Sequence, residues 1–272
     1  MNEAELLFTQ ILHCNRLSLY LDDNLRLDKD KSYLISEVFK KRILGEPIEY
    51  ILGETEFMGL EFRLTPDVFI PRPETEILVE AALKLVKCLM FNVGCLNILD
   101  IGTGTGCIAI SLAKFISAVK VIAIDISSSA LEIGEENSCL NGVEDKIKFI
   151  QANIFNIKHN TLNIEQFDII VSNPPYIPTA EIDNLHPGIK YEPYIALDGG
   201  RDGLGFYRRI IRDSADYLKE DGLLIMEMGF DQKEAIKNIF QNSENFKIID
   251  VVQDYNNIDR VIIAQMKKAR YG

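Results

Sequence analysis

The run Ser172-Asn173-Pro174-Pro175-Tyr176 carries the residue types needed to hold a planar amino group. Two consecutive prolines have no backbone N–H to donate, so they leave carbonyl acceptors in a chain of fixed shape. The Asn173 side-chain oxygen and the Pro174 carbonyl can accept from both N–H groups of a planar –NH₂, while the Tyr176 ring covers one face of it. Such a grip would orient a weakly nucleophilic amide or aromatic amine nitrogen, so positioning and electrostatics would carry the catalysis.

A second chemical signal is Asp100-Ile101-Gly102-Thr103-Gly104-Thr105-Gly106. Its glycines let a ligand approach the backbone closely, and the helix that follows offers free N–H groups to polar or anionic atoms. A dinucleotide fingerprint GxGxxG starting at Gly102 needs glycine at position 107, which is Cys107. The spacing therefore favours a nucleoside with an amino-acid tail, such as S-adenosylmethionine. A tight turn without a ligand is the alternative.

Polar residues after the next two predicted strands extend this cofactor site. Asp125 follows Gly106 by 19 residues and closes a predicted strand. A carboxylate at this place can accept hydrogen bonds from both ribose hydroxyls. Asn153-Ile154-Phe155 follows the third predicted strand, at the same edge of the sheet.

Strands and helices alternate from residue 97 onward, which predicts a parallel sheet with helices on both faces. Too few residues separate the last two strands for a helical crossover, so these strands must pair antiparallel. A seven-strand, mostly parallel sheet with an antiparallel C-terminal hairpin is the α/β arrangement of class I S-adenosylmethionine-dependent methyltransferases. The predicted strands are 97–101, 120–125, 146–152, 167–172, 223–228, 246–252 and 260–265, and the last two predicted helices are 206–218 and 232–240.

The N-terminal part of the chain has a different pattern. Apolar residues such as Leu7 and Ile11 recur at helical spacing, which predicts a small helical N-terminal domain over residues 1–52. Short extended runs separated by turn residues then predict a β-hairpin linker over residues 53–70. Residues 71–272 form the predicted S-adenosylmethionine-binding catalytic domain.

The composition, with 47% hydrophobic and 26% charged residues, is typical of a soluble globular protein. The net charge of −12 makes DNA a poor partner, because phosphate binding draws on clustered Lys and Arg. The three histidines lack metal-ligand spacing, so we expect no metal. The longest uncharged stretches fall short of the roughly 18–20 apolar residues that cross a bilayer. Five cysteines without CxxC spacing, and no signal peptide, predict reduced packing residues in a cytoplasmic protein.

Further segments carry a family resemblance from about residue 40 to the C-terminus. They are Gly45-Glu46-Pro47-Ile48-Glu49-Tyr50-Ile51-Leu52-Gly53, Phe57 with Gly59, Phe69-Ile70-Pro71-Arg72-Pro73-Glu74-Thr75-Glu76, Glu192-Pro193, Ala196-Leu197, Asp202-Gly203-Leu204, Glu227-Met228-Gly229 and Asp259-Arg260. Together with the two motifs above, they closely resemble the HemK/PrmC family, the peptide chain release factor N5-glutamine methyltransferases.

The resemblance implies methyl transfer from S-adenosylmethionine to the N5 side-chain amide of the glutamine in the Gly-Gly-Gln motif of bacterial class-I release factors. The N-terminal domain and hairpin would help to recognise that protein. By position, the implied cofactor-binding residues are Gly102, Thr103, Gly104, Thr105, Gly106, Asp125, Asn153, Ile154 and Asn173. The residues implied to hold the glutamine are Asn173, Pro174, Pro175 and Tyr176, of which Asn173, Pro174 and Tyr176 would be catalytic.

Two positions depart from the relatives. Asn153 stands where Asp is common, and Ile154 stands where some relatives place Trp, so apolar contact with adenine survives but aromatic stacking is lost. The resemblance also implies that the segment around Arg72–Glu76 borders the substrate groove; the alternative for Arg72 is a simple ion pair with a neighbouring carboxylate. Glu227 is interpreted as a strand-end residue with no ligand contact.

Three alternative functions remain at this stage. Asn-Pro-Pro-Tyr also serves nucleic-acid adenine N6-methyltransferases, although the acidic charge disfavours them. A ribosomal-protein N5-glutamine methyltransferase shares nearly every feature. The sequence of residues 71–76 favours a release factor as the substrate. A non-enzymatic binding module would not need both motifs intact.

Overall fold

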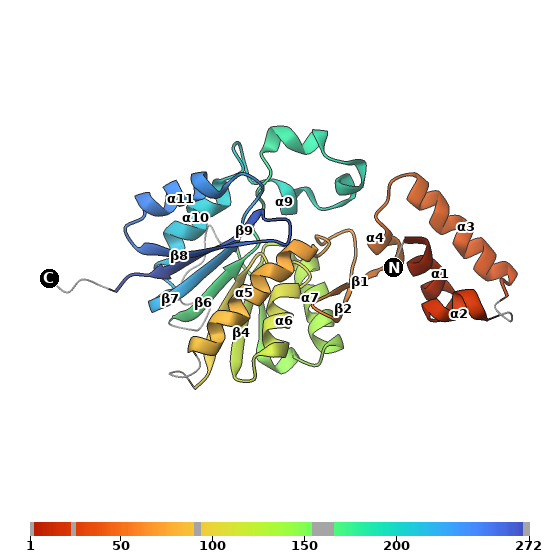
Figure 1. Cartoon of the computed structure of the whole chain (residues 1–272), viewed down its shortest axis with the longest axis horizontal. Coiled ribbons are helices and arrows are strands. Elements are labelled where there is room, and N and C mark those ends of the chain that lie inside the picture. Colours follow the sequence, from red (N-terminus) through yellow and green to blue (C-terminus); the bar gives the residue numbers. More distant parts are fainter. Residues whose placement is uncertain (1–2, 23–25, 90–93, 154–165, 269–272) are drawn as a thin grey trace.

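The computed structural model describes residues 3–22, 26–89, 94–153 and 166–268. A seven-stranded sheet lies at its centre, in the order β5-β4-β3-β6-β7-β9-β8 (Figure 1). Neighbours from β5 to β7 pair parallel, whereas β9 pairs antiparallel with both β7 and β8. The predicted sheet and its antiparallel C-terminal hairpin are confirmed. The strands are β3 (Leu96–Ile101), β4 (Val119–Asp125), β5 (Ile147–Gln151), β6 (Phe167–Ser172), β7 (Leu218–Glu227), β8 (Phe246–Gln253) and β9 (Asp259–Met266).

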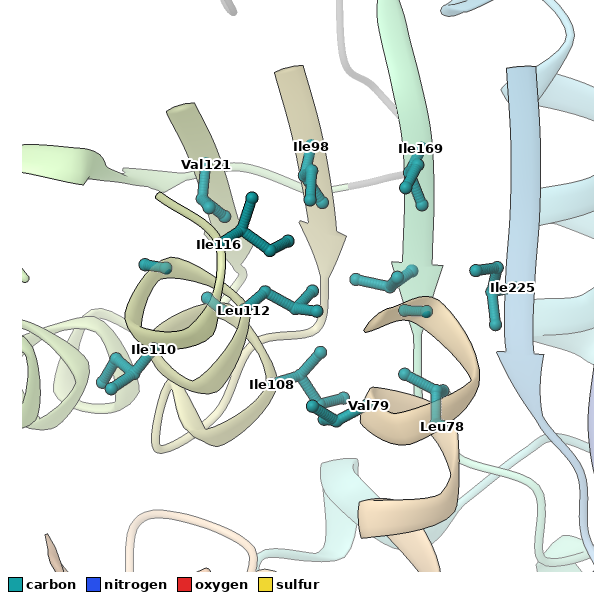
Figure 2. Close-up of a cluster of buried hydrophobic side chains, with 14 of the residues drawn as sticks. Leu78, Val79, Ile98, Ile108, Ile110, Leu112, Ile116, Val121, Ile169 and Ile225 are labelled. Carbon is teal, nitrogen blue, oxygen red and sulfur yellow. The ribbon is translucent and has the colours of Figure 1, made fainter. Parts of the chain in front are cut away.

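Helices cover both faces of this sheet (Figure 1). Side chains alternate across a strand, so Ile98 of β3 packs in the core under α5 and α6, whereas Leu99 packs in the core under α10 and α11. Figure 2 shows the first core, where Ile98 and Ile169 of the sheet face helix side chains such as Leu112. The helices are α5 (Pro73–Leu89), α6 (Cys107–Phe115), α7 (Ser128–Leu140), α10 (Gly205–Ser214) and α11 (Lys233–Asn242). Both faces of the sheet are buried, which explains the continuous apolar runs of the central strands.

The N-terminal helices gather at one side of the sheet and have a small core of their own (Figure 1). They are α1 (Glu3–Leu12), α2 (Arg16–Leu21), α3 (Lys29–Ile43) and α4 (Ile48–Leu52), and their core consists of Leu7, Ile11, Ile35, Val38 and Ile48. A hairpin of β1 (Glu54–Phe57) and β2 (Leu60–Arg63) follows and contacts α7, where the Arg63 backbone N–H donates to Asn137 Oδ1 over 2.7 Å. The hairpin therefore links the N-terminal helices to the sheet layers.

The segment after β6 contains short elements that no sequence pattern predicts. It consists of two 3₁₀ helices, η2 (Thr179–Asn184) and η3 (Pro187–Tyr191), and the short α9 (Tyr194–Leu197). A further 3₁₀ turn, η1 (Glu144–Lys146), precedes β5. The segment after β6 extends toward the N-terminal helices (Figure 1). There the Tyr191 hydroxyl donates to the Leu44 carbonyl over 3.2 Å.

Three sequence predictions differ from the structure. The helix predicted over 206–218 ends at Ser214, and Leu218 already belongs to β7, because the polar stretch from Lys219 to Gly222 conceals the start of that strand. The hairpin predicted over residues 53–70 ends at Arg63, and residues 64–70 form no strand; their apolar side chains pack instead against Tyr50 and Ala130. The expected packing role of the cysteines holds for buried Cys107 but is wrong for Cys95 and Cys139, which are exposed.

Candidate active site

A cavity opens at the carboxyl ends of β3, β4 and β6. Strand β3 has β4 on one side and β6 on the other, so the order of the strands reverses here. In an open α/β sheet, a ligand crevice forms at the carboxyl ends of the strands at such a point. The cavity volume is about 290 Å³. The predicted site residues that line it are Gly102, Thr103, Gly104, Thr105, Asp125, Asn153, Asn173, Pro174, Pro175 and Tyr176.

The glycine-rich turn after β3 presents its backbone to this cavity. Gly102 and Gly104 have φ angles of 72° and 53°, in the left-handed region that favours glycine. Among the described atoms, a Cβ built on either residue would meet nothing within 4 Å. Gly106 is different, because it caps α6 outside the cavity lining and a Cβ there would lie 2.9 Å from Ile110 Cδ1. Close packing explains Gly106, whereas open ligand space lies beside the other two.

Asp100 stabilises the same turn through a hydrogen bond. Its side chain is fully buried, and its Oδ2 accepts a hydrogen bond from Thr103 Oγ1 over 2.6 Å. Burial raises the pKa of Asp100 to about 7, although the Thr103 hydrogen bond opposes that shift. Asp100 therefore shapes the turn, and it is absent from the described cavity wall.

The end of β4 supplies a carboxylate to the cavity. Asp125 Oδ2 accepts from the Gly104 backbone N–H over 2.9 Å, and Oδ1 accepts from the Ser127 backbone N–H over 3.0 Å. Each carboxylate oxygen has a second lone pair, so Asp125 keeps acceptor capacity for a ligand. Asn153 lines the cavity beyond β5, whereas Ile154, predicted to flank adenine, lies outside the described residues.

The Asn-Pro-Pro-Tyr run leaves the end of β6 directly into the cavity. Ser172 is buried and pairs with Ile101 across the sheet, and its Oγ donates to the Ile101 carbonyl over 2.8 Å. This bond fixes the last residue of β6 beside the last residue of β3. Asn173 therefore emerges next to the glycine-rich turn, although 67 or more residues separate them along the chain.

Two glycines, Gly203 and Gly229, pack closely against Tyr176, and we call them the glycine collar. A Cβ on Gly229 would lie 2.8 Å from Tyr176 Cδ2, and a Cβ on Gly203 would lie 2.3 Å from the Tyr176 carbonyl oxygen. That carbonyl also accepts from Gln232 Nε2 over 2.9 Å. Burial, and then the nearby charge of Glu227, raise the pKa of Tyr176 to about 12. The ring is therefore a neutral, fixed wall of the cavity.

Two buried residues connect to Asn173 by hydrogen bonds: Thr75, which lies in the segment implied by the resemblance to border the groove, and Glu227. Thr75 Oγ1 donates to Glu227 Oε2 over 2.7 Å, and Asn173 Nδ2 donates to Thr75 Oγ1 over 3.0 Å. Burial raises the pKa of Glu227 to about 7. The sequence interpretation of Glu227 as a plain strand end is incomplete, since its side chain closes a polar network behind the cavity. Only the tertiary structure brings these three residues together.

Arg72 borders the cavity and forms an ion pair with buried Glu192. Its guanidinium also lies 4.8 Å from the centre of the Phe69 ring. Glu192 Oε2 accepts from the Ile70 backbone N–H over 3.3 Å. Burial raises the pKa of Glu192, and Arg72 opposes that shift. The structure thus shows both interpretations of Arg72 at once, a carboxylate partner at the edge of the cavity.

Metal ligands and membrane-spanning helices are both missing from the described ranges. Within them, no group of three or more His, Cys, Asp or Glu side chains is arranged to hold a metal ion. No helix in the part of the chain that the structure covers is both long and apolar enough to span a membrane.

Comparison with known proteins connects this geometry to a family. The family described as "Methyltransferase domain" matches residues 94–269, and that described as "PrmC N-terminal domain" matches residues 1–53. A curated protein of Thermodesulfovibrio yellowstonii named release factor glutamine methyltransferase is 39% identical over 270 residues, which is 99% of this chain and 94% of that protein. One of the same name from Geobacter sulfurreducens is 38% identical over 261 residues, 96% of this chain and 87% of that protein.

Solved structures share the fold at lower identity. The crystal structure of ribosomal protein L11 methylase from Lactobacillus delbrueckii subsp. bulgaricus aligns with a TM-score of 0.54 and 22% identity, covering 76% of this chain and 86% of that one. At this identity the similarity shows the methyltransferase fold alone.

Proposed function

The chain belongs to the release factor glutamine methyltransferase family, and from that premise we propose that it methylates the N5 amide of the glutamine in the Gly-Gly-Gln motif of bacterial class-I release factors, with S-adenosylmethionine as methyl donor. The observation that carries this proposal is that Asn173 to Tyr176 and the glycine-rich turn line one cavity. Release factors act in translation, so we propose that the protein works in the cytoplasm.

The residues present fit the cofactor. Open space lies where Gly102 and Gly104 would carry a Cβ, so a ligand can lie against that backbone. Asp125 faces the same space with acceptor capacity for ribose hydroxyls, and Asn153 lies at the end of the next strand. When bound, S-adenosylmethionine supplies a methyl group on a positively charged sulfur. Thr103 and Thr105 complete the proposed cofactor wall, and Ile154 stays a prediction.

The run after β6 would hold the glutamine amide. The Asn173 Oδ1 and the Pro174 carbonyl accept one N–H each, which orients the nitrogen and draws electron density onto it. Pro174 and Pro175 have no N–H that could compete for these acceptors. The Tyr176 ring, fixed by its glycine collar, covers one face of the amide and excludes water. We assign no residue as general base.

The N-terminal helices are proposed to recognise the protein substrate. We keep residues 1–52 as the recognition domain, 53–70 as the linker and 71–272 as the catalytic domain. Support comes from the separate core of the N-terminal helices and from the Tyr191 to Leu44 hydrogen bond, which joins them to the segment that follows the catalytic run. A release factor would then contact both parts. We propose no DNA, membrane or metal partner.

The proposal is tested with methyl-labelled S-adenosylmethionine and four acceptors offered in parallel. They are purified class-I release factor, the same factor with its motif Gln changed to Ala, ribosomes and DNA. We expect label on the unmodified factor alone. Equal label on the Gln-to-Ala factor would refute the target residue, and label on ribosomes or DNA in its place would refute the substrate class.

A further inference from the structure

A buried hydrogen-bonded chain reaches Asn173 from two distant elements. Thr75 lies in the first turn of α5 and Glu227 ends β7, and their relative exposures are 2% and 1%. Thr75 donates to Glu227, and Asn173 donates to Thr75. We propose that Thr75 and Glu227 are positioning residues that hold the Asn173 amide with its Oδ1 toward the substrate. This inference rests on the proposed function of Asn173.

The direction of the chain follows from donor and acceptor chemistry. An ionised carboxylate can only accept hydrogen bonds, so the Thr75 hydroxyl must spend its single proton on Glu227. Its oxygen then has only lone pairs left to offer, and the group opposite must be a donor. The –NH₂ end of Asn173 satisfies that requirement, whereas its oxygen does not. Glu227 therefore determines, through Thr75, which end of the amide faces the cavity.

This choice matters because the two ends of an asparagine amide have nearly the same shape. With Oδ1 toward the cavity, Asn173 accepts from the N–H of the glutamine amide. With the amide flipped, two –NH₂ groups would face each other and the grip would fail. Packing alone cannot distinguish these two orientations of the amide, whereas the buried hydrogen bonds through Thr75 to Glu227 can.

The ionisation state of Glu227 controls the orientation of the Asn173 amide. Burial raises the pKa of Glu227 to about 7, opposed by the hydrogen bond from Thr75 and by the charge of Arg260, and assisted by the charge of Glu74. A protonated Glu227 could donate to Thr75, which would free the Thr75 hydroxyl to donate to the oxygen of a flipped Asn173. The oriented state is therefore the ionised one, and we expect activity to rise as the pH rises through about 7.

The competing interpretation is that Thr75 and Glu227 only tie α5 to the sheet. In that case their loss would lower stability and cofactor binding without a specific effect on turnover. The two interpretations differ in kcat, in the pH profile and in the response to a conservative hydroxyl variant, and the experiment uses these readouts.

The first experiment compares Thr75→Val, which removes the hydroxyl at constant shape, with Thr75→Ser, which keeps it. Release factor methylation is followed for the wild-type enzyme and both variants. We expect Thr75→Val to lower kcat by roughly 10- to 100-fold, as slight misplacement of a reacting group does, while the Kd for S-adenosylmethionine changes by less than about threefold. Thr75→Ser should restore most of the rate. A Thr75→Val enzyme as fast as the wild type would overturn the inference.

The second experiment uses Glu227→Gln and stands even if Thr75→Val fails to fold. The wild-type kcat should fall as the pH drops below the pKa of Glu227, and Glu227→Gln should be slower with that acidic limb absent. An acidic limb retained unchanged in Glu227→Gln would refute the role of Glu227. If the wild-type enzyme does not methylate release factor at all, the proposed function fails; if it does and the variants match it, only the positioning fails.

Discussion

Asp125 Oδ2 accepts a hydrogen bond from the backbone N–H of Gly104 over 2.9 Å. The bond joins the carboxyl end of β4 to the turn that follows β3, so two features predicted separately from the sequence form one structural unit. The carboxylate stabilises the shape of the turn while it faces the cavity. Loss of its charge should therefore affect the cofactor more than the protein substrate.

Asp125→Asn should weaken cofactor binding. A hydrogen bond to a charged group contributes about 1.5–3 kcal/mol, so the Kd for S-adenosylmethionine should rise by roughly 10- to 100-fold. Calorimetric titration measures this Kd directly. The matched control is Asp216→Asn, on an exposed aspartate away from the cavity, which should bind as the wild type does. Equal affinity in Asp125→Asn would contradict the assignment.

Asn173→Ala should abolish the grip on the amide while sparing most of the cofactor site. Removing one preorganised polar group from a transition-state contact lowers kcat by about 100- to 1,000-fold. We expect that loss in steady-state methylation of release factor, with only a moderate loss of cofactor affinity. Asn256→Ala, in an exposed turn, serves as the control. An undiminished rate would remove Asn173 from catalysis.

Gly203→Ala should displace Tyr176. Its Cβ would lie 2.3 Å from the Tyr176 carbonyl oxygen, a distance that forces the backbone after Pro175 to move. The control is Gly59→Ala, because Gly59 has the same φ of 71° and a Cβ there would meet no described atom within 4 Å. Both variants carry the same backbone strain, so a loss of methylation in Gly203→Ala alone isolates the displacement. Equal activity of the two variants would contradict the role of Gly203 in fixing the position of Tyr176.

Glu227→Gln should make the protein more stable at alkaline pH. The folded-state pKa of Glu227 is raised from 4.5 to about 7, so the folded protein holds a proton that the unfolded chain releases in that window. The stability of the wild type therefore falls as pH rises from 4.5 through 7, and the neutral Gln avoids this. We expect a gain of about 1–3 kcal/mol in the free energy of unfolding near pH 8 and little gain near pH 5. Denaturant titrations at both pH values test this; a gain that does not depend on pH would contradict it.

The sequence was sufficient for the sheet and for the two motifs because both depend on local patterns. Strand β6 matched its predicted bounds, since a short apolar run that ends at Asn-Pro-Pro has a clear stop. The connection between β8 and β9 is too short for a helical crossover, so its length alone predicts the antiparallel pairing of these strands. Glycine spacing similarly distinguished the turn after β3 from a dinucleotide site.

The remaining features depend on contacts between distant residues. Thr75 and Asn173 are 98 positions apart, and Thr75 and Glu227 are 152 positions apart, so no local pattern relates them. The early start of β7 is hidden because a polar stretch, from Lys219 to Gly222, follows its first residue. Gly106 also fits the cofactor spacing, but its contact with Ile110 is a packing requirement that spacing alone cannot reveal.

The central claim is most directly tested by a crystal structure with the demethylated cofactor product and a peptide that contains Gly-Gly-Gln. We predict that the glutamine amide nitrogen lies within hydrogen-bond distance, roughly 2.7–3.2 Å, of both Asn173 Oδ1 and the Pro174 carbonyl oxygen. Its free face should point toward the sulfur of the cofactor product. A glutamine side chain bound elsewhere, or an amide nitrogen that contacts neither oxygen, would contradict the account.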